Sequence, residues 1–234
     1  MELQHKKVVV AGGTSGIGLA AALLFHQAGA SVTVTGRDPG KLKAARSKGL
    51  GAVRADSRDP AEMEGFFRSG GSLDHLVIAL GSSKGVGNFA DLRLEDIREG
   101  FEEKYFPQLT TLKAALPCLK KRGTVTLITA ITASAKMPGT SGIGSVNGAL
   151  EIYVPILAKE LKPLRINAVS PGVVDTPWWD FLPQDAKRQT FEEFSSQIAV
   201  GRVAQPDDIA KTILFLTQNP YMTGKIIACD GGLA

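Results

Sequence analysis

A doubly wound parallel sheet with helices on both faces, in a single α/β domain, is the fold class that this sequence predicts. Runs typical of β-strands alternate with helical patterns along the whole chain, and such β-then-α repeats form parallel sheets with right-handed crossovers. A glycine-rich stretch directly follows the first of these runs. No composition shift or low-complexity linker divides residues 1–234, so we expect one domain.

The expected strands are short runs rich in aliphatic residues, and the expected helices have longer mixed patterns. We expect strands at 8–11, 31–35, 52–55, 73–80, 124–130, 165–169 and 225–228. We expect helices at 17–28, 42–47, 61–68, 94–120, 141–161 and 206–217. The run at 73–80 is almost continuously apolar, which indicates a central strand buried on both faces. Ligands of such a sheet bind at the carboxyl ends of its strands.

Composition and charge narrow the class of protein. Of the 234 residues, 44% are hydrophobic and 21% are charged, as in soluble globular domains, and the formal net charge is +4. Lysines and arginines are spread along the chain, so we expect no nucleic-acid partner. No window approaches the roughly 18 apolar residues of a membrane span, and residues 1–7 lack the apolar core of a signal peptide. We therefore expect a cytoplasmic protein without a membrane partner, and no metal, because the two cysteines lack metal-ligand spacing.

The glycine-rich stretch predicts a site for a nucleotide phosphate. It joins the first expected strand to the first expected helix, and its candidate cofactor residues are Gly12, Thr14, Ser15, Gly16, Ile17 and Gly18. Backbone N–H groups and the positive end of a helix dipole can hold a pyrophosphate at such a junction. Glycine permits the close approach of main chain and phosphate because it has no side chain.

The end of the second expected strand predicts which dinucleotide binds. An acidic residue there would grip the adenosine ribose and repel a 2′-phosphate. This chain has Gly36 and Arg37 instead. No carboxylate repels the 2′-phosphate, and the guanidinium of Arg37 can donate two hydrogen bonds to it. The sequence therefore favours NADP(H) over NAD(H). The alternative is that Arg37 is a solvated turn residue.

Two polar residues follow the third expected strand. Asp56 can accept a hydrogen bond from the adenine amino group, and Ser57 stands beside it. The alternative for Asp56 is an N-cap of the helix that follows.

A long irregular region is expected from Pro171 to about Val200. It contains five aromatic residues, namely Trp178, Trp179, Phe181, Phe191 and Phe194. A loop of this length inside a compact domain is usually functional, so we interpret residues 171–200 as a substrate lid over an apolar or aromatic compound. The alternatives are packing into the core or burial at a subunit interface.

Several motifs together resemble the short-chain dehydrogenase/reductase family over nearly the whole chain. The glycine loop is similar to the family's Thr-Gly-x-x-x-Gly-x-Gly, with Ala11 in place of Thr. Residues 167–177 resemble the family's segment after the sixth strand, and 201–210 and 223–232 resemble its C-terminal landmarks. The resemblance implies further cofactor contacts at Gly81, Pro171, Gly172, Val174 and Thr176. It also implies a small-molecule substrate and a homodimer or homotetramer.

The family's reaction, by this resemblance, uses a Ser-Tyr-Lys-Asn set, and this chain departs from all four positions. Aligned through 138–139 and 148–150, it has Ile143 at the Tyr position and Asn147 at the Lys position. Ala130 falls at the Ser position, and Lys104 falls at the Asn position. Lys and Asn have thus exchanged places on two expected helices.

This exchange suggests a rewired proton relay. We expect Lys104 to reach the nicotinamide ribose and relay region and to be held there by Asn147, which is therefore also a candidate cofactor contact. Desolvation lowers the pKa of an ammonium, so Lys104 can donate a proton in place of Tyr. Thr129 is the candidate for the missing substrate hydroxyl, with Thr132 as its alternative. The competing interpretation makes Lys104 a solvated or ion-paired helix residue and Asn147 a local cap.

Functions from different classes remain open at this point. The first is an NADP(H)-dependent oxidoreductase that acts on a small apolar or aromatic carbonyl or alcohol through Lys104 and Asn147. The second is a catalytically inactive NADP(H)-binding sensor or assembly partner, because the phosphate-binding features are present while the catalytic positions are altered. A non-redox lyase or isomerase that retains the nucleotide is a third interpretation.

Overall fold

Seven parallel strands form one sheet, in the order β3-β2-β1-β4-β5-β6-β7, in the computed structural model, which describes residues 2–234. The strands are β1 (Lys7–Ala11), β2 (Ser31–Gly36), β3 (Gly51–Arg54), β4 (Leu73–Ile78), β5 (Leu119–Ile128), β6 (Arg165–Pro171) and β7 (Ile226–Cys229). The α-helices are α1 (Gly16–Gln27), α2 (Pro39–Arg46), α3 (Pro60–Gly70), α4 (Leu94–Gly100), α5 (Phe106–Ala115), α6 (Ser141–Glu160), α7 (Gln184–Gln197) and α8 (Pro206–Gln218). The predicted doubly wound α/β fold is confirmed.

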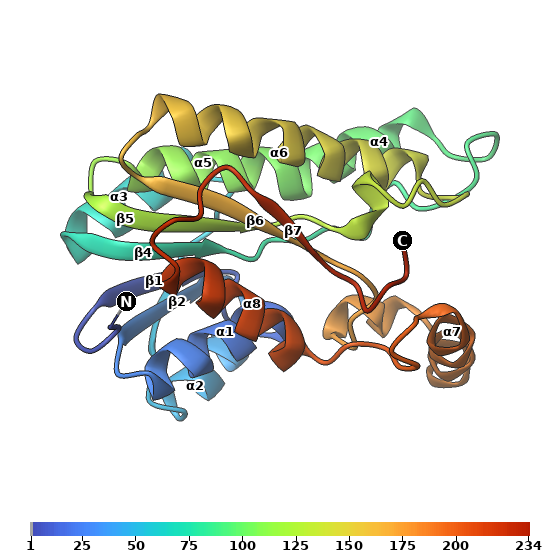
Figure 1. Cartoon of the computed structure of the whole chain (residues 1–234), viewed down its shortest axis with the longest axis horizontal. Coiled ribbons are helices and arrows are strands. Elements are labelled where there is room, and N and C mark those ends of the chain that lie inside the picture. Colours follow the sequence, from blue (N-terminus) through green and yellow to red (C-terminus); the bar gives the residue numbers. More distant parts are fainter. Residues whose placement is uncertain (1) are drawn as a thin grey trace.

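Helices cover both faces of the sheet, with α1, α2 and α8 on one side and α3, α5 and α6 on the other (Figure 1). On the first face, Phe25 of α1 and Ile213 of α8 are buried in one hydrophobic core. On the second face, Met63 of α3 and Leu150 of α6 are buried in another core. β4 lies between them and is buried along its whole length, as predicted. Among residues 2–234, no helix is both long enough and apolar enough to span a bilayer.

The helix predicted at 94–120 is shorter and is interrupted. A π-helical segment, Phe101–Tyr105, separates α4 from α5, and β5 already begins at Leu119. Pro107 explains the interruption, because it has no N–H for the bond to the fourth preceding carbonyl and its ring would collide with that carbonyl. A wider π turn just before the proline relieves both problems. Lys104 lies within this segment.

The prediction that residues 171–200 are irregular is wrong. It contains a short 3-10 helix, Pro177–Phe181, and the fourteen-residue α7. Figure 1 shows α7 set apart from the two helical layers. Three aromatic residues of the region 171–200 form a small core with Val173, Ile198 and Val203, namely Trp179 of the 3-10 helix and Phe191 and Phe194 of α7. These three therefore follow the core-packing alternative. The sequence pattern did not reveal α7 because only two large apolar side chains, three residues apart, mark a mostly polar helix.

His75 predicts an acid sensitivity of the fold. It is 2% exposed in β4, its Nδ1 lies 3.0 Å from Thr124 Oγ1, and its Nε2 has no partner within residues 2–234. Burial lowers the pKa of His75 from 6.5 to about 4. Between pH 6.5 and about pH 4, His75 binds a proton in the unfolded chain but not in the native chain. The contribution of His75 to the free energy of unfolding is therefore fully present above pH 6.5 and is lost as the pH falls toward 4. Between pH 7 and pH 5 we expect a loss of about 2 kcal/mol.

Urea unfolding at pH 7 and pH 5 measures this loss. In His75→Asn the difference between the two pH values should shrink by about 2 kcal/mol relative to the parent chain. His26→Asn, at an exposed position of α1, is the matched control and should keep the parental difference. An equal pH difference in all three proteins would contradict the assignment to His75.

Candidate active site

The predicted cofactor residues meet at one edge of the sheet because all seven strands run parallel. The chain passes from β1 outward to β2 and β3, and then returns past β1 to β4 on its other side. The carboxyl ends of β1 and β4 therefore diverge into oppositely directed connections, which is the topological switch point where such sheets bind ligands. The glycine loop follows β1 at this point.

The glycine loop leaves no room for side chains. A Cβ on Gly12 would lie 2.5 Å from the carbonyl oxygen of Ala79, and Gly12 has a φ of +74°. A Cβ on Gly18 would overlap the carbonyl oxygen of Gly12. Both glycines are therefore required for the loop to fold back against the end of β4.

The first turn of α1 is open to an anion. Ser15 occupies the N-cap position without a side-chain hydrogen bond to the turn, and the first turn contains no acidic residue. The helix thus presents its leading N–H groups and its positive dipole end at the edge of the sheet. Thr14, Gly16 and Ile17 lie around this turn, as predicted. The backbone here fits a dinucleotide pyrophosphate.

Gly18→Ala should disturb this loop specifically. Because the new methyl group would collide with backbone rather than with a mobile side chain, we expect a destabilisation of about 1–3 kcal/mol and weaker NADPH binding. Thermal or urea unfolding with an NADPH titration measures both effects. Gly65→Ala in α3, where a Cβ meets nothing within 4 Å, is the control and should be neutral or slightly stabilising. Equal stability of parent and Gly18→Ala would refute the packing argument.

The end of β2 lies directly against the glycine loop. A Cβ on Gly36 would lie 2.8 Å from Cγ2 of Thr14, so a larger residue would push the two segments apart. Arg37 follows, is exposed, and makes no hydrogen bond or ion pair within the described chain. Its guanidinium is therefore available at the position where the sequence predicts contact with a 2′-phosphate.

Asp56 and Ser57 lie after β3, at the same edge. Asp56 is paired with Arg58, whose Nη2 lies 2.6 Å from Oδ2, and this hydrogen bond holds the pKa of Asp56 below its usual value. The helix-cap alternative for Asp56 is wrong, because Asp59 accepts hydrogen bonds from the N–H groups of the first turn of α3. Ser57 is buried. The adenine contact of Asp56 stays a prediction.

The segment after β6 comes close to the glycine loop. Pro171 ends β6 beside Cys229, and Gly172 donates its N–H to the Cys229 carbonyl oxygen over 3.1 Å. Thr176 is near enough to Gly16 that a Cβ there would lie 3.3 Å from its methyl group. Val174 buries its side chain in the core, and its carbonyl oxygen accepts from Trp179 Nε1 over 3.0 Å, so its predicted cofactor contact is limited to its backbone N–H.

One further contact joins the 3-10 helix to the segment after β4, which also contains Gly81. Trp178 donates its Nε1–H to the Ser82 carbonyl oxygen over 2.8 Å, which joins the 3-10 helix to the segment after β4. Gly81 precedes Ser82, is exposed, and would have no atom within 4 Å of an added Cβ. The sequence analysis did not single out Ser82, because a backbone acceptor leaves no signal in residue type.

Lys104 is buried at the carboxyl end of β5. It is 5% exposed, and its Nζ donates to Asn147 Oδ1 over 2.7 Å and to the Thr129 carbonyl oxygen over 3.0 Å. The expected contact between Lys104 and Asn147 is therefore present. The interpretation of Lys104 as a solvated or ion-paired residue is wrong. Burial lowers the pKa of Lys104 to about 8, and the negative charge of Glu151 opposes this shift.

Asn147 holds Lys104 but is not open to a ligand. It is 0% exposed, and its Nδ2 donates to Thr132 Oγ1 over 3.0 Å and to the Ile143 carbonyl oxygen over 2.9 Å. Both amide protons are therefore used within the protein. In this arrangement Oδ1 of Asn147 is also engaged, by Lys104, so the structure gives no support to the expected cofactor contact of Asn147, which stays a prediction.

The hydroxyl groups of Thr129 and Thr132, on either side of Ala130, have different hydrogen-bond partners. Thr129 directs its hydroxyl to Glu151 Oε1 at 2.9 Å and to the Val169 carbonyl oxygen at 3.2 Å, away from Lys104. Its carbonyl oxygen, not its hydroxyl, faces the ammonium. Thr132 accepts from Asn147 and keeps its own proton to donate. The hydroxyl predicted at Thr129 is therefore better supplied by Thr132, which is the alternative weighed above.

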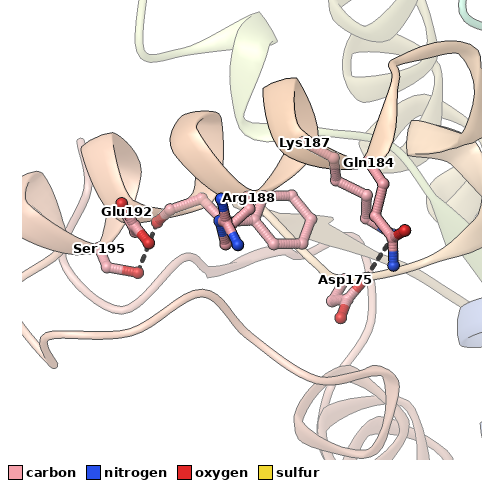
Figure 2. Close-up of a pocket in the computed structure, with 7 residues that line it drawn as sticks. Asp175, Gln184, Lys187, Arg188, Glu192 and Ser195 are labelled. Atoms are coloured by element: carbon pink, nitrogen blue, oxygen red, sulfur yellow. Dashed lines mark hydrogen bonds and ion pairs between the residues drawn. The ribbon is translucent and has the colours of Figure 1, made fainter.

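A cavity of about 560 Å³ lies away from this cluster, on α7. Figure 2 shows Lys187 and Asp175 directed toward one another, and their ion pair measures 2.9 Å. The lining also includes Gln184, Arg188, Phe191, Glu192 and Ser195. None of Lys104, Asn147 or Thr132 lines it. The cavity is lined by Asp175 and by residues of α7.

Comparison with known proteins agrees with this geometry. The family model described as enoyl-(acyl carrier protein) reductase matches residues 11–234. The chain belongs to the short-chain dehydrogenase/reductase family. Carbonyl reductase family member 4 of Xenopus tropicalis is 31% identical over 242 residues, covering 97% of this chain and 98% of the relative. The 3-oxoacyl-(acyl-carrier-protein) reductase FabG of Thermotoga maritima is 27% identical over 249 residues, covering 100% and 99%.

Solved structures of the short-chain dehydrogenase/reductase family share the fold. A short-chain dehydrogenase/reductase from Brucella melitensis superposes with a TM-score of 0.91 at 27% identity, covering 100% of this chain and 98% of that chain. A small-chain dehydrogenase in complex with NADPH gives a TM-score of 0.86 at 29% identity, covering 98% and 99%. The chain therefore belongs to a family of oxidoreductases and has the family's dinucleotide-binding fold.

Proposed function

We propose that this protein is an NADP(H)-dependent oxidoreductase that interconverts a small apolar or aromatic carbonyl compound and its alcohol, with Lys104 as the proton donor and acceptor. The observation that carries the proposal is the buried ammonium of Lys104, held by Asn147 and Thr129 at the carboxyl end of β5. The resemblance assigns Ile143 to the place of the family's Tyr, and an aliphatic side chain cannot exchange a proton.

The bonding around Lys104 suits a group that changes its charge. An ammonium has three N–H donors, and two of them are used by Thr129 and Asn147. A neutral amine has two donors and one lone pair, so both hydrogen bonds persist when the third proton leaves. A pKa of about 8 lies near neutral pH, where a general acid or base works best.

The residues at the carboxyl edge fit the cofactor. When bound, a nicotinamide dinucleotide supplies or accepts the hydride. The N–H groups at the start of α1 would hold its pyrophosphate, and Arg37 would pair with a 2′-phosphate, which favours NADP(H). The NADPH complex of a similar dehydrogenase supports this choice.

Thr132 and the lid complete the proposed substrate site. The hydroxyl of Thr132 would donate to the substrate oxygen, because it accepts from Asn147 Nδ2 and its own proton is not engaged in the described chain. Residues 171–200 would cover the site, with Trp178 already linked to Ser82 on the opposite wall. The indole ring in that position favours an apolar or aromatic substrate over a strongly polar one.

A homodimer or homotetramer is part of the same proposal. Phe106 of α5 and Ile152 and Ile156 of α6 are 48%, 69% and 46% exposed, respectively, on the outer side of the second helical layer. Large apolar side chains on neighbouring helices are typical of subunit interfaces. Light scattering of the purified chain should give two or four times the monomer mass of 24.7 kDa.

Binding and turnover, measured together, test the proposed function. NADPH and NADH are titrated by fluorescence, and NADPH consumption is followed with a panel of aldehydes, ketones and quinones. Tight NADPH binding with turnover supports the oxidoreductase. Tight binding without turnover on any member of the panel would overturn it in favour of the inactive NADP(H)-binding sensor. Absence of NADPH binding would overturn both.

A further inference from the structure

We propose that Glu151 is a positioning residue that sets the charge state of Lys104, so that the buried ammonium and the partly buried carboxylate form an acid–base couple joined through Thr129. The proposal rests on the proposed role of Lys104 and adds the group that keeps it protonated. Glu151 stands on α6 four residues after Asn147, so both side chains project from the same face of the helix.

Glu151 is anchored by the ends of two strands. Its Oε1 accepts from Thr129 Oγ1 over 2.9 Å and from Ser170 Oγ over 2.8 Å. These two hydrogen bonds fix the Glu151 carboxylate between the ends of β5 and β6. Thr129 therefore contacts both members of the couple: its hydroxyl bonds to Glu151, and its carbonyl oxygen bonds to Lys104.

A buried ammonium requires a compensating charge, because its desolvation is costly. The charged groups closest in sequence do not supply it. Glu102 is exposed, and Glu103 accepts from Ser82 Oγ over 2.7 Å. On α4, Glu99 is paired with Lys84 at 2.7 Å.

The titratable ring next to Lys104 does not compensate it either. Tyr105 packs edge-on against Tyr153 of α6, with ring centroids 6.4 Å apart. Glu151 is linked to Lys104 through Thr129, and its negative charge raises the pKa of Lys104, which burial lowers. The ammonium therefore depends on this carboxylate.

The charge state of Lys104 determines whether the enzyme is ready for reduction or for oxidation. Reduction transfers a hydride from NADPH to the carbonyl carbon and a proton from Lys104 to the carbonyl oxygen, which yields the alcohol, NADP⁺ and a neutral amine. Oxidation requires the neutral amine at the start. Neutralising Glu151 should therefore weaken reduction at neutral pH and favour oxidation, and the pH profiles of both directions should move to lower pH.

The direct test measures the titration of Lys104 in the full chain without cofactor. The protein is labelled with ¹³C-lysine, the Lys104 signal is assigned through Lys104→Arg, and its pKa is read by NMR. In Glu151→Gln, whose amide oxygen can still accept from Thr129 and Ser170, we expect the pKa to fall by about one unit or more. Glu151→Asp, which keeps the charge, should restore most of the parental value.

Two further variants keep the test decisive. Glu160→Gln, at the exposed end of α6, should leave the pKa of Lys104 unchanged. If Glu151→Gln does not fold, Glu151→Leu replaces it and should lower the pKa at least as far. An unchanged pKa in a folded Glu151 variant would overturn the couple. A lowered pKa together with a parent chain that turns over no substrate would retain the couple and reject the proposed function.

Discussion

Lys104→Met is expected to lower kcat for carbonyl reduction by about 100-fold or more. General acid–base catalysis contributes about 100-fold to 10,000-fold, and Met keeps the length and apolar stem of Lys without an exchangeable proton. The cofactor residues at the glycine loop and Arg37 are unchanged, so the Kd for NADPH should stay within about threefold of the parental value. Steady-state kinetics and a fluorescence titration measure the two quantities separately.

Lys113→Met is the matched control for this experiment. Lys113 also lies on the helical stretch that contains Lys104, but it is exposed and has no bond to Asn147 or Thr129. The same substitution there should leave kcat within about twofold. The proposed role of Lys104 fails if Lys104→Met, folded at the assay temperature, retains the parental kcat. Replacement removes the partner of two buried acceptors, so a stability loss of about 1–3 kcal/mol is expected.

Arg37→Glu is expected to raise the Kd for NADPH by about 100-fold and to leave or improve the affinity for NADH. A hydrogen bond between charged groups contributes about 1.5–3 kcal/mol, and the new carboxylate adds repulsion of a 2′-phosphate. The same carboxylate can accept from the ribose diol of NADH. Arg37 is exposed and unpaired within the described residues, so its loss should not change the stability of the fold.

Lys43→Glu provides the control for the change in net charge. It makes the same reversal on the exposed side of α2 and should leave the ratio of the two Kd values unchanged at moderate ionic strength. Equal losses of affinity for NADPH and NADH in Arg37→Glu would instead indicate a general phosphate attraction. That outcome would contradict a specific 2′-phosphate site.

Short-range features of the sequence predicted the fold and the close backbone approach of the glycine loop. Gly12 and Gly18 could be recognised because a backbone that must approach closely tolerates no other residue type. The apolar run of β4 could be recognised because a strand buried on both faces has no polar side. The π-helical segment was not predicted, because it depends on the backbone geometry that Pro107 requires and not on a hydrophobic pattern. Helix α7 was not predicted, because most of its sides are exposed and it therefore has few apolar residues.

By itself, the sequence determined the doubly wound fold, the phosphate loop and the exchange of Lys104 with Asn147, because each depends on residue type and spacing along the chain. Only the tertiary structure decided what Lys104 touches. Burial between α6 and β5 lowers its pKa to about 8 and gives it Asn147 and the Thr129 carbonyl as acceptors, and the hydroxyl of Thr129 connects this cluster to Glu151. Desolvation and charge pairing act between segments far apart in the chain, so no local pattern reports them.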